Sequence, residues 1–349
     1  MKTTFFAILL IISRIATYSQ VCPAISSAWN ITSSTSISIP NSEDLTTDDY
    51  GNIYVIGHFT SSLNFTNGTT LSAATGTLYI AKFNPDSTVI WAINAGGNSG
   101  ISIQSRGISV SPDGSNIYIT GFFSNTVTFG SQPAITSTIK PNLAYSNDIF
   151  VAKLRDVGGL RTWQWAVKAG GISGDKAQCM TMDNAGKLYI GGILEYYDTS
   201  AGDAIPFNEQ NCTFGATTID CIRGYDLFVT RLTDNGSSAT WDWVRSSEQK
   251  YLGNPICNAV AGITMINDEV FGIATNKTNG DVFITGSVYL NVSTNAQSFY
   301  IGSQQFQQGL NYDMFVSKLD TDGNWQWATR AGGHWGKYLW KRRWKRNRS

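Results

Sequence analysis

Hydrophobic and polar residues alternate in short runs along this chain, and one run returns four times. It reads TLYIAKF (77–83), DIFVAKL (148–154), DLFVTRL (226–232) and DMFVSKL (313–319). Each copy places aromatic or β-branched residues at alternate positions, which is typical of a strand with two distinct faces. Four copies of one run predict one structural unit that is built four times.

Three further segments accompany this run in a fixed order. A strand led by a turn residue precedes it, as GNIYVIGHF (51–59), SNIYITGFF (115–123), GKLYIGGIL (186–194) and GDVFITGSV (280–288). A short strand (NFTNG, TFGS, TFGA, YIGS) lies between the two, and a tryptophan strand follows, as VIWA (89–92), WQWA (163–166), WDWV (241–244) and WQWA (325–328). The order predicts a β-meander of four strands in each unit.

A single four-stranded antiparallel sheet leaves two edges and two faces exposed, and radial stacking of several sheets buries the faces. We therefore expect an all-β fold, a β-propeller of four-stranded antiparallel blades. Four blades are recognisable in the repeat region 44–333, at about 44–107, 108–179, 180–262 and 263–333. A solenoid would also give a long repeat, but solenoids rarely hold four hairpin-linked strands per coil.

The combined pattern is G-N-x-Y-V-x-G, F-G, D-x-F-V-x-K-L and D-x-x-G-x-x-x-W-A, followed by a glycine pair. Over roughly 44–333 it resembles the secreted seven-bladed β-propeller (SBBP) repeat family. The glycine pair stands at Gly96-Gly97, Gly170-Gly171 and Gly332-Gly333, whereas the third unit has Arg245-Ser246-Ser247. The resemblance implies a propeller fold in an extracellular setting. Members of the family mostly have no established activity, so it implies little about function.

Residues 1–19 have the features of a signal peptide. Lys2 gives a positive start, FFAILLII is an apolar run, and the small residues Thr17 and Ser19 suit a peptidase cut after position 19. The apolar run is too short to cross a bilayer, which takes about 20 residues. We expect an exported, soluble mature chain, with a retained N-terminal anchor as the alternative.

The segment 20–43 contains Trp29, which stands about as far before the first unit as other tryptophan strands stand before theirs. This spacing indicates a blade-closing strand over 26–33, and therefore a further, incomplete blade at the C-terminal end. The tail 334–349 (HWGKYLWKRRWKRNRS) departs from the repeat. We interpret it as an out-of-frame end, which predicts an open or imperfectly closed ring. The alternatives are a native basic tail for anionic surfaces and a membrane-active or calmodulin-like helix.

The formal net charge of zero conceals an uneven distribution. The tail from residue 337 onward holds seven Lys or Arg residues and no acid. Setting aside these seven, together with Lys2 and Arg14, removes nine of the 25 bases and leaves 16 against 25 acids. An acidic body argues against nucleic acid or an anionic membrane as the partner.

Few residues suggest chemistry. The two histidines are His58, expected to be structural, and His334, and there is no CxxC pair, so catalytic triads and zinc sites are disfavoured. The turn from Asp320 to Asn324 resembles the start of a calcium loop but lacks the closing acid, so a hairpin turn is the better interpretation. The D-x-x-G-x-x-x-W spacing is also similar to the repeat of quinoprotein dehydrogenases, without their vicinal cysteines. We expect no metal and no cofactor.

Two sets of residues gain interest from their positions. Four bases at equivalent positions near a strand end (Lys82, Lys153, Arg231 and Lys318) suggest packing of the stem and pairing with a neighbouring acid, with a ring of basic ligands as the alternative. Of five cysteines, Cys212 and Cys221 make the best disulfide candidate. Cys22, Cys179 and Cys257 then leave one cysteine unpaired.

The candidate ligand site is the insert EYYDTSAGDAIPFNEQN of the third unit, because it mixes acids with aromatics. Its candidate ligand-binding residues are Tyr196, Tyr197, Asp198, Asp203, Phe207 and Glu209. Strand parity in the meander predicts that 195–212 and 289–300 form one rim, stiffened by Cys212–Cys221, while 130–147 and 246–270 lie on the opposite face. A solvated loop is the plain alternative.

These features predict a secreted or cell-surface, non-enzymatic β-propeller that acts as a binding, adhesion or display module. Its expected partner is an extracellular protein or glycan, without nucleic acid and without membrane insertion of the mature chain. The alternative is a carbohydrate-binding or carbohydrate-active propeller, a lectin or a glycosidase, that uses the 195–212 insert.

Overall fold

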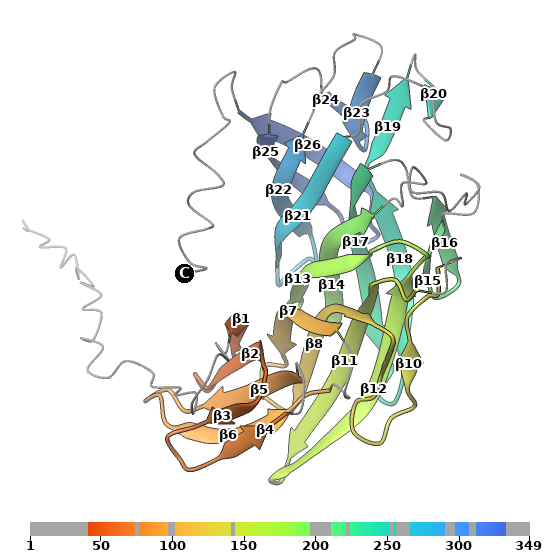
Figure 1. Ribbon diagram of the computed structural model, residues 1–349. Helices are drawn as coiled ribbons and strands as arrows, with labels where there is room; N and C mark the ends of the chain where they lie inside the picture. Colours follow the sequence, from red (N-terminus) through yellow and green to blue (C-terminus); the bar gives the residue numbers. More distant parts are fainter. Residues whose placement is uncertain are drawn as a thin grey trace, which may run out of the picture. The chain divides into compact units, whose positions relative to one another are not determined.

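The repeated units fold as antiparallel sheets, drawn in chain order from β1 to β26 in the computed structural model (Figure 1). The structure describes residues 41–73, 77–96, 102–140, 144–195, 211–220, 224–251, 254–255, 266–289, 297–306 and 312–332. All regular structure in these ranges is β, so the all-β prediction is confirmed. The predicted signal peptide 1–19, Trp29 and the tail 334–349 lie outside the described residues.

In each unit four strands pair in the order first, second, third, fourth. Only the strands of unit 1 form a four-stranded sheet by themselves, since the sheet of unit 2 extends to six strands and units 3 and 4 share an eight-stranded sheet among the described residues. Unit 1 contains β1 (Asn41–Thr47), β2 (Ile53–Phe59), β5 (Thr77–Phe83) and β6 (Val89–Asn94). Unit 2 contains β7 (Ser102–Val110), β8 (Asn116–Ser124), β11 (Asp148–Val157) and β12 (Leu160–Gly170). Unit 3 contains β13 (Lys176–Met182), β14 (Lys187–Glu195), β17 (Gly224–Asp234) and β18 (Ala239–Ser246). Unit 4 contains β21 (Ile266–Thr275), β22 (Val282–Tyr289), β25 (Tyr312–Leu319) and β26 (Trp325–Ala331).

The predicted meander is wrong in one strand per unit. The short segment between the second and third strands does not enter the sheet, because β2 pairs directly with β5 and its counterparts do the same. It forms part of a two-stranded hairpin: β3 (Ser62–Asn64) with β4 (Thr70–Ser72), β9 (Thr126–Val127) with β10 (Ile135–Thr136), β15 (Asn211–Phe214) with β16 (Thr217–Asp220), and β23 (Gln297–Ile301) with β24 (Gln304–Phe306). Two of these hairpins also pair with other strands, because β15 joins β12 of unit 2 and β23 joins β19 (Glu248–Tyr251). The fourth member of each sheet is instead the strand that precedes the Gly-led one.

These first strands share a β-bulge rather than a sequence. The bulge falls between Ser105 and Gly107 in β7 and at the equivalent place in the three other first strands. It brings a carbonyl against the glycine of the second strand: a Cβ at Gly121 would lie 1.9 Å from the carbonyl oxygen of Gln104. The other three second strands have Gly57, Gly192 and Gly286 at this place, each against a backbone carbonyl oxygen about as close. The bulge thus explains the second glycine of the G-N-x-Y-V-x-G pattern.

Apolar clusters join successive units in pairs. Tyr54 and Ile56 of unit 1 pack in one buried cluster with Ile119 of unit 2, and the same arrangement recurs between units 2 and 3 and between units 3 and 4. This confirms the predicted packing of aromatic and β-branched residues between neighbouring sheets. The described part of the chain does not form a closed propeller.

Strand direction gives each sheet two different ends. At the turn end, short turns join the first strand to the second and the third to the fourth. At the connection end lie all the longer connections, from the second strand to the third and from the fourth strand to the next unit. Pairing of β19 (Glu248–Tyr251) with β23 places a connection of unit 3 beside one of unit 4. The prediction that 246–270 and 130–147 face away from 289–300 is therefore wrong, because it counted the short segment as a sheet strand.

Candidate functional site

The six predicted ligand residues Tyr196, Tyr197, Asp198, Asp203, Phe207 and Glu209 lie outside the described residues, and so does Cys221. Their roles and the Cys212–Cys221 pair stay predictions. The structure does describe the base of the insert. Cys212 is buried on β15 with its sulfur 3.3 Å from Oδ1 of Asp175. The insert therefore starts and ends beside a buried carboxylate of unit 3.

Glu195, the last residue of β14, is the described anchor of the insert. Its Oε2 lies 3.5 Å from the Lys176 ammonium, and its Oε1 accepts a hydrogen bond from the Tyr225 hydroxyl at 3.3 Å. The Glu195 carboxylate is about one third exposed. A polar ligand on the insert could therefore reach it.

From Lys176 a series of contacts crosses to unit 1. The Lys176 ammonium lies 5.8 Å from the centre of the Phe122 ring, and the Arg106 guanidinium lies 5.5 Å from the same centre. Arg106 pairs with Glu43 at 2.7 Å, and Glu43 lies 3.4 Å from Nδ1 of His58. We refer to these residues together as the charged row: His58, Glu43, Arg106, Phe122, Lys176 and Glu195.

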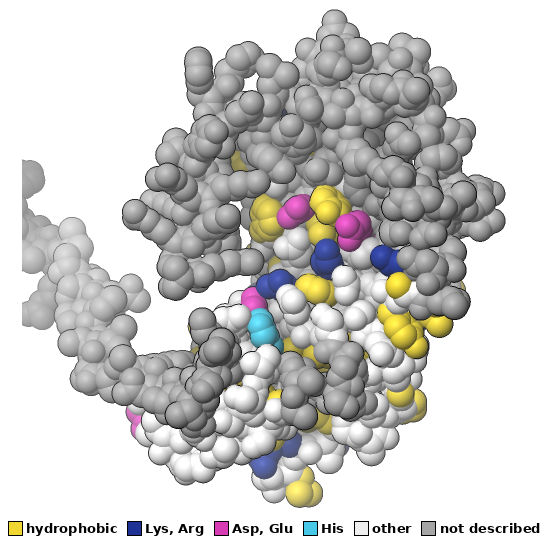
Figure 2. All heavy atoms as spheres, viewed as in Figure 1, with side chains coloured by type: hydrophobic (Ala, Val, Ile, Leu, Met, Phe, Trp, Pro, Cys, Tyr) yellow, Lys and Arg dark blue, Asp and Glu magenta, His cyan; other side chains and the backbone are white. Residues whose placement is uncertain are grey.

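The bulges explain why the row lies on one surface. Glu43 and Arg106 are the extra residues of their bulges, and the bulge turns each side chain away from the regular alternation of its strand. Their side chains are about one fifth exposed. On the face drawn in Figure 2, basic and acidic side chains lie beside histidine and among apolar ones. The row is thus held by mutual contacts and still reaches solvent.

Burial shifts the pKa values of titratable groups in and near the charged row. Desolvation lowers the pKa of His58, although the charge of Glu43 opposes that effect. Desolvation raises the pKa of Glu269, which is opposed by a hydrogen bond from Gln178 and by the charge of Lys176. The row therefore keeps a neutral histidine beside a glutamate–arginine pair near neutral pH.

Two deeper carboxyls hold the connections in place. Asp175 accepts hydrogen bonds from the backbone N–H groups of Gly171 at 2.7 Å and Glu195 at 3.2 Å. Asp268 accepts from the backbone N–H of Leu227 at 2.8 Å and from the Ser247 hydroxyl at 2.6 Å. Burial raises the pKa of Asp175 to about 8 and that of Asp268 to about 7. Both groups organise backbone and are closed to a ligand.

Sequence reasoning missed the charged row. Glu43, Arg106 and Lys176 lie on first strands, whose sequences do not repeat, so no periodic signal marks them. The available signal was the second glycine of the repeated strand, because a glycine inside a strand often marks a bulge.

The turn end holds the contacts that join units. Trp91 Nε1 donates to Asp156 at 3.0 Å, and Trp165 Nε1 donates to Asp234 at 2.9 Å. At the third junction Trp243 Nε1 donates to the carbonyl oxygen of Thr321 at 3.1 Å. We call each such contact, made to the third-to-fourth-strand turn of the following unit or to the end of the strand before that turn, a junction clamp.

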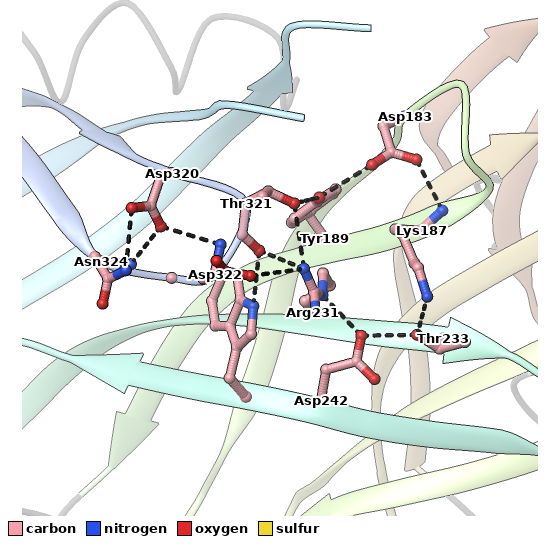
Figure 3. A network of polar contacts seen from close by, with 12 residues as sticks. Asp183, Lys187, Tyr189, Arg231, Thr233, Asp242, Asp320, Thr321, Asp322 and Asn324 are labelled. Carbon is pink, nitrogen blue, oxygen red and sulfur yellow. Dashed lines mark hydrogen bonds and ion pairs between the residues drawn. The ribbon is translucent and has the colours of Figure 1, made fainter. Parts of the chain in front are cut away.

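The four periodic bases pair with acids, as the sequence predicts. Lys82 lies 3.4 Å from Asp156 and Lys153 lies 2.5 Å from Asp234, so both bases bind the acid of a clamp. Arg231 pairs with Asp242 at 2.7 Å and also donates to the carbonyl oxygen of Thr321 (Figure 3). Lys318 pairs with Asp281 at 2.6 Å.

The turn end also contains a cavity of about 380 Å³. It is lined by the ends of β1, β7 and β13 and includes Asp44, Asp183 and Lys277. These groups are engaged already. Asp44 accepts from the backbone N–H of Ile108 at 2.9 Å, Asp183 accepts from the Tyr189 hydroxyl at 3.0 Å, and Lys277 donates to the carbonyl oxygen of Met182.

Among the described residues, no group of three or more His, Cys, Asp or Glu side chains could hold a metal ion. No helix there is long and apolar enough to cross a membrane. Asp320 accepts from the backbone N–H groups of Asp322 at 3.0 Å and Asn324 at 2.8 Å, so this segment is a hairpin turn (Figure 3).

Comparison of the whole sequence with protein-family models gives no match, and comparison with curated proteins gives none either. The resemblance to the SBBP repeat family therefore stays a prediction that rests on the repeated motifs.

Proposed function

We propose that this chain is a secreted or cell-surface, non-enzymatic β-propeller that binds an extracellular protein or glycan at its connection end. One observation carries the proposal: the charged row runs across units 1 to 3 and ends at Glu195, the base of the third-unit insert. Loops carried on rigid sheets are common binding sites. The SBBP-like repeats support the extracellular setting as an expectation.

The chemistry of the row suits a ligand of mixed polarity. Two acid–base pairs, Arg106 with Glu43 and Lys176 with Glu195, both direct their base toward the Phe122 ring. A strongly charged polymer would be repelled by one member of each pair, whereas a sugar or a protein loop can bond to both signs. The contacts among these side chains also fix their rotamers before the ligand arrives, which reduces the entropy lost on binding.

A lectin is the more specific form of this proposal. Tyr225 and Glu195 offer a hydroxyl and a carboxylate at the base of an insert that carries further tyrosines and acids. Sugar sites combine such groups with aromatic surface. In this form, Tyr196 and Tyr197 supply the aromatic contact and Glu195 accepts hydrogen bonds from sugar hydroxyls.

The test is a screen of the full chain on a glycan array and on an array of immobilised matrix proteins. We expect at least one specific signal. In the double variant Arg106→Ala/Lys176→Ala this signal should fall about tenfold or more, because two charged hydrogen-bond donors are lost. The matched control is Arg155→Ala, which removes an exposed base near the turn end and should bind like the wild type.

Two results would count against the proposal. Equal losses in the double variant and in Arg155→Ala would show a nonspecific charge effect. Full binding by the double variant, with an unchanged melting temperature, would remove the charged row from the site. A signal only on the glycan array, lost in Tyr196→Ala/Tyr197→Ala, would select the lectin form.

A further inference from the structure

Unit 4 has an outer face that resembles an unfilled junction. The tryptophans of the three junction clamps are buried, with 7%, 3% and 7% of their surface exposed at Trp91, Trp165 and Trp243. Trp327 stands at the equivalent position of unit 4 and is 45% exposed. Beside it lie Phe283, with ring centres 6.3 Å apart, and Lys318. Unit 4 thus presents the aromatic and basic half of a clamp.

The three junctions define what this half binds. In each, the indole N–H donates to an oxygen where the third strand of the next unit meets its turn: the carboxylates of Asp156 and Asp234 at the ends of β11 and β17, and the carbonyl of Thr321 in the turn of unit 4. In each, the Lys or Arg of the preceding unit approaches the same turn. The expected occupant of the face on unit 4 is therefore a turn of this type that carries a carbonyl or carboxylate oxygen.

Within the described residues, the turn 84–88 of unit 1 is the one third-to-fourth-strand turn that joins no preceding unit. It matches the turn of unit 4: Asn84 N–H donates to the carbonyl of Thr88 at 2.8 Å and Ser87 N–H to that of Asn84 at 2.9 Å. In unit 4 the corresponding bonds join Asp320 with Asn324 and Gly323 with Asp320, each at 3.0 Å.

The correspondence assigns a partner atom to each group. Pro85 corresponds in position to Thr321, whose carbonyl oxygen accepts a hydrogen bond from Trp243. Asp86 corresponds in position to Asp322, whose carboxylate lies 3.9 Å from the Arg231 guanidinium. Asp86 is exposed. A turn 84–88 seated on unit 4 would bring the Pro85 carbonyl to Trp327 Nε1 and the Asp86 carboxylate to Lys318.

We propose that two copies of this chain associate head to tail, with the turn 84–88 of one copy bound to the face of Phe283, Lys318 and Trp327 on the other. Units 1 and 4 do not close a ring within the described residues, and the proposal takes the matching turn from a second molecule. In a pair of molecules joined this way, the turn 84–88 of one copy and the face of the other remain free. Further copies can therefore bind at either end. This contact lies at the turn end and is independent of the binding function proposed above.

The test is the mass of the full chain in solution, measured by light scattering at rising concentration. Wild type should exceed the monomer mass as concentration rises. Trp327→Glu blocks the face and Asp86→Lys blocks the turn, so each variant alone should stay monomeric over a range at least tenfold wider. An equimolar mixture of the two should form a dimer and no larger species, because only one productive contact remains.

The control is Leu160→Glu, which places a charge on another exposed apolar residue near a turn and should associate like wild type. A wild type that stays monomeric at every concentration overturns the proposal. If that monomer also loses thermal stability in Trp327→Glu, the face is filled within the same chain. A mixture of the two blocked variants that fails to dimerise shows that these two surfaces do not pair.

Discussion

Single buried carboxyls organise the connection end of this protein. Asp175 and Asp268 accept backbone N–H groups that would otherwise lack partners in the interior. Burial disfavours their charged forms, and this desolvation raises the pKa of Asp175 to about 8. Burying these carboxyls costs free energy of desolvation, which their hydrogen bonds offset. The bonds of Asp175 also fix the backbone at 171 and 195, which supports the charged row.

This pKa predicts how stability changes with pH. The unfolded Asp175 carboxyl has its usual pKa of 3.8 and the folded one a pKa of about 8. Between these values only the folded state holds the proton, so the contribution is full below about pH 4 and is lost as pH rises toward 8. In Asp175→Asn the free energy of unfolding should vary less between pH 5 and pH 8.

Urea denaturation at the two pH values measures the difference. The control Asp49→Asn changes an exposed carboxyl and should keep the wild-type dependence. If Asp175→Asn shows the same loss between pH 5 and pH 8 as wild type, Asp175 is ionised in the folded protein throughout this range.

Residue roles could be predicted from the sequence where the residues recur. The periodic bases Lys82, Lys153, Arg231 and Lys318 pair with acids as expected, because a fixed strand position meets the same neighbour in every unit. The row residues Glu43, Arg106 and Lys176 differ in chemical type from unit to unit. Their association depends on tertiary contacts between first strands, and no local pattern encodes such contacts.

At the scale of the element, the bulge of the first strand determines the shape of each sheet edge. It brings the carbonyl of Gln104 to 1.9 Å from the place where a Cβ of Gly121 would lie, far inside any allowed contact. The atoms nearest to this Cβ belong to the backbone of Gln104 and Ser105, so they cannot move aside as a flexible side chain could. The glycine is thus a requirement of the bulge.

We therefore expect Gly121→Ala to destabilise the chain by about 3 kcal/mol or more, in the range of the most damaging single substitutions. The control is Gly158→Ala, at φ 63° with no heavy atom within 4 Å of the added Cβ. It should cost only the backbone strain of about 1 kcal/mol. Chemical denaturation of both variants gives the comparison, and equal costs would contradict a steric role for the bulge.

The repeated strands could be predicted from the sequence, whereas the order of the strands in each sheet could not. The Gly-led strands were expected near Gly51, Ser115, Gly186 and Gly280 and are observed from Ile53, Asn116, Lys187 and Val282. The short segment has strand character but pairs in a hairpin, and in unit 3 also with β12 of unit 2, instead of with the second and third strands of its own unit. The true first strands, such as NSEDLTT, contain polar residues at positions that contact other units, so their period is weak. Assigning the wrong strand also reversed the expected face of the long connections.

At the scale of the whole molecule, the two ends of the sheets carry different contacts, and we propose that only the connection end binds a ligand. The turn end holds the junction clamps, in which Trp and Lys or Arg of one unit bind the turn of the next. The connection end holds the long segments and the charged row. Short turns suit a fixed joint between units, and long connections tolerate the insertions that create a binding surface.

Hydrogen–deuterium exchange of the full chain, with and without the ligand found on the arrays, tests this division most directly. The account predicts slower exchange on binding at 104–107 and 171–176, which carry or support the charged row. It predicts unchanged exchange at the turns 111–115 and 183–187. Protection confined to those turns, with none at the connection end, would contradict it.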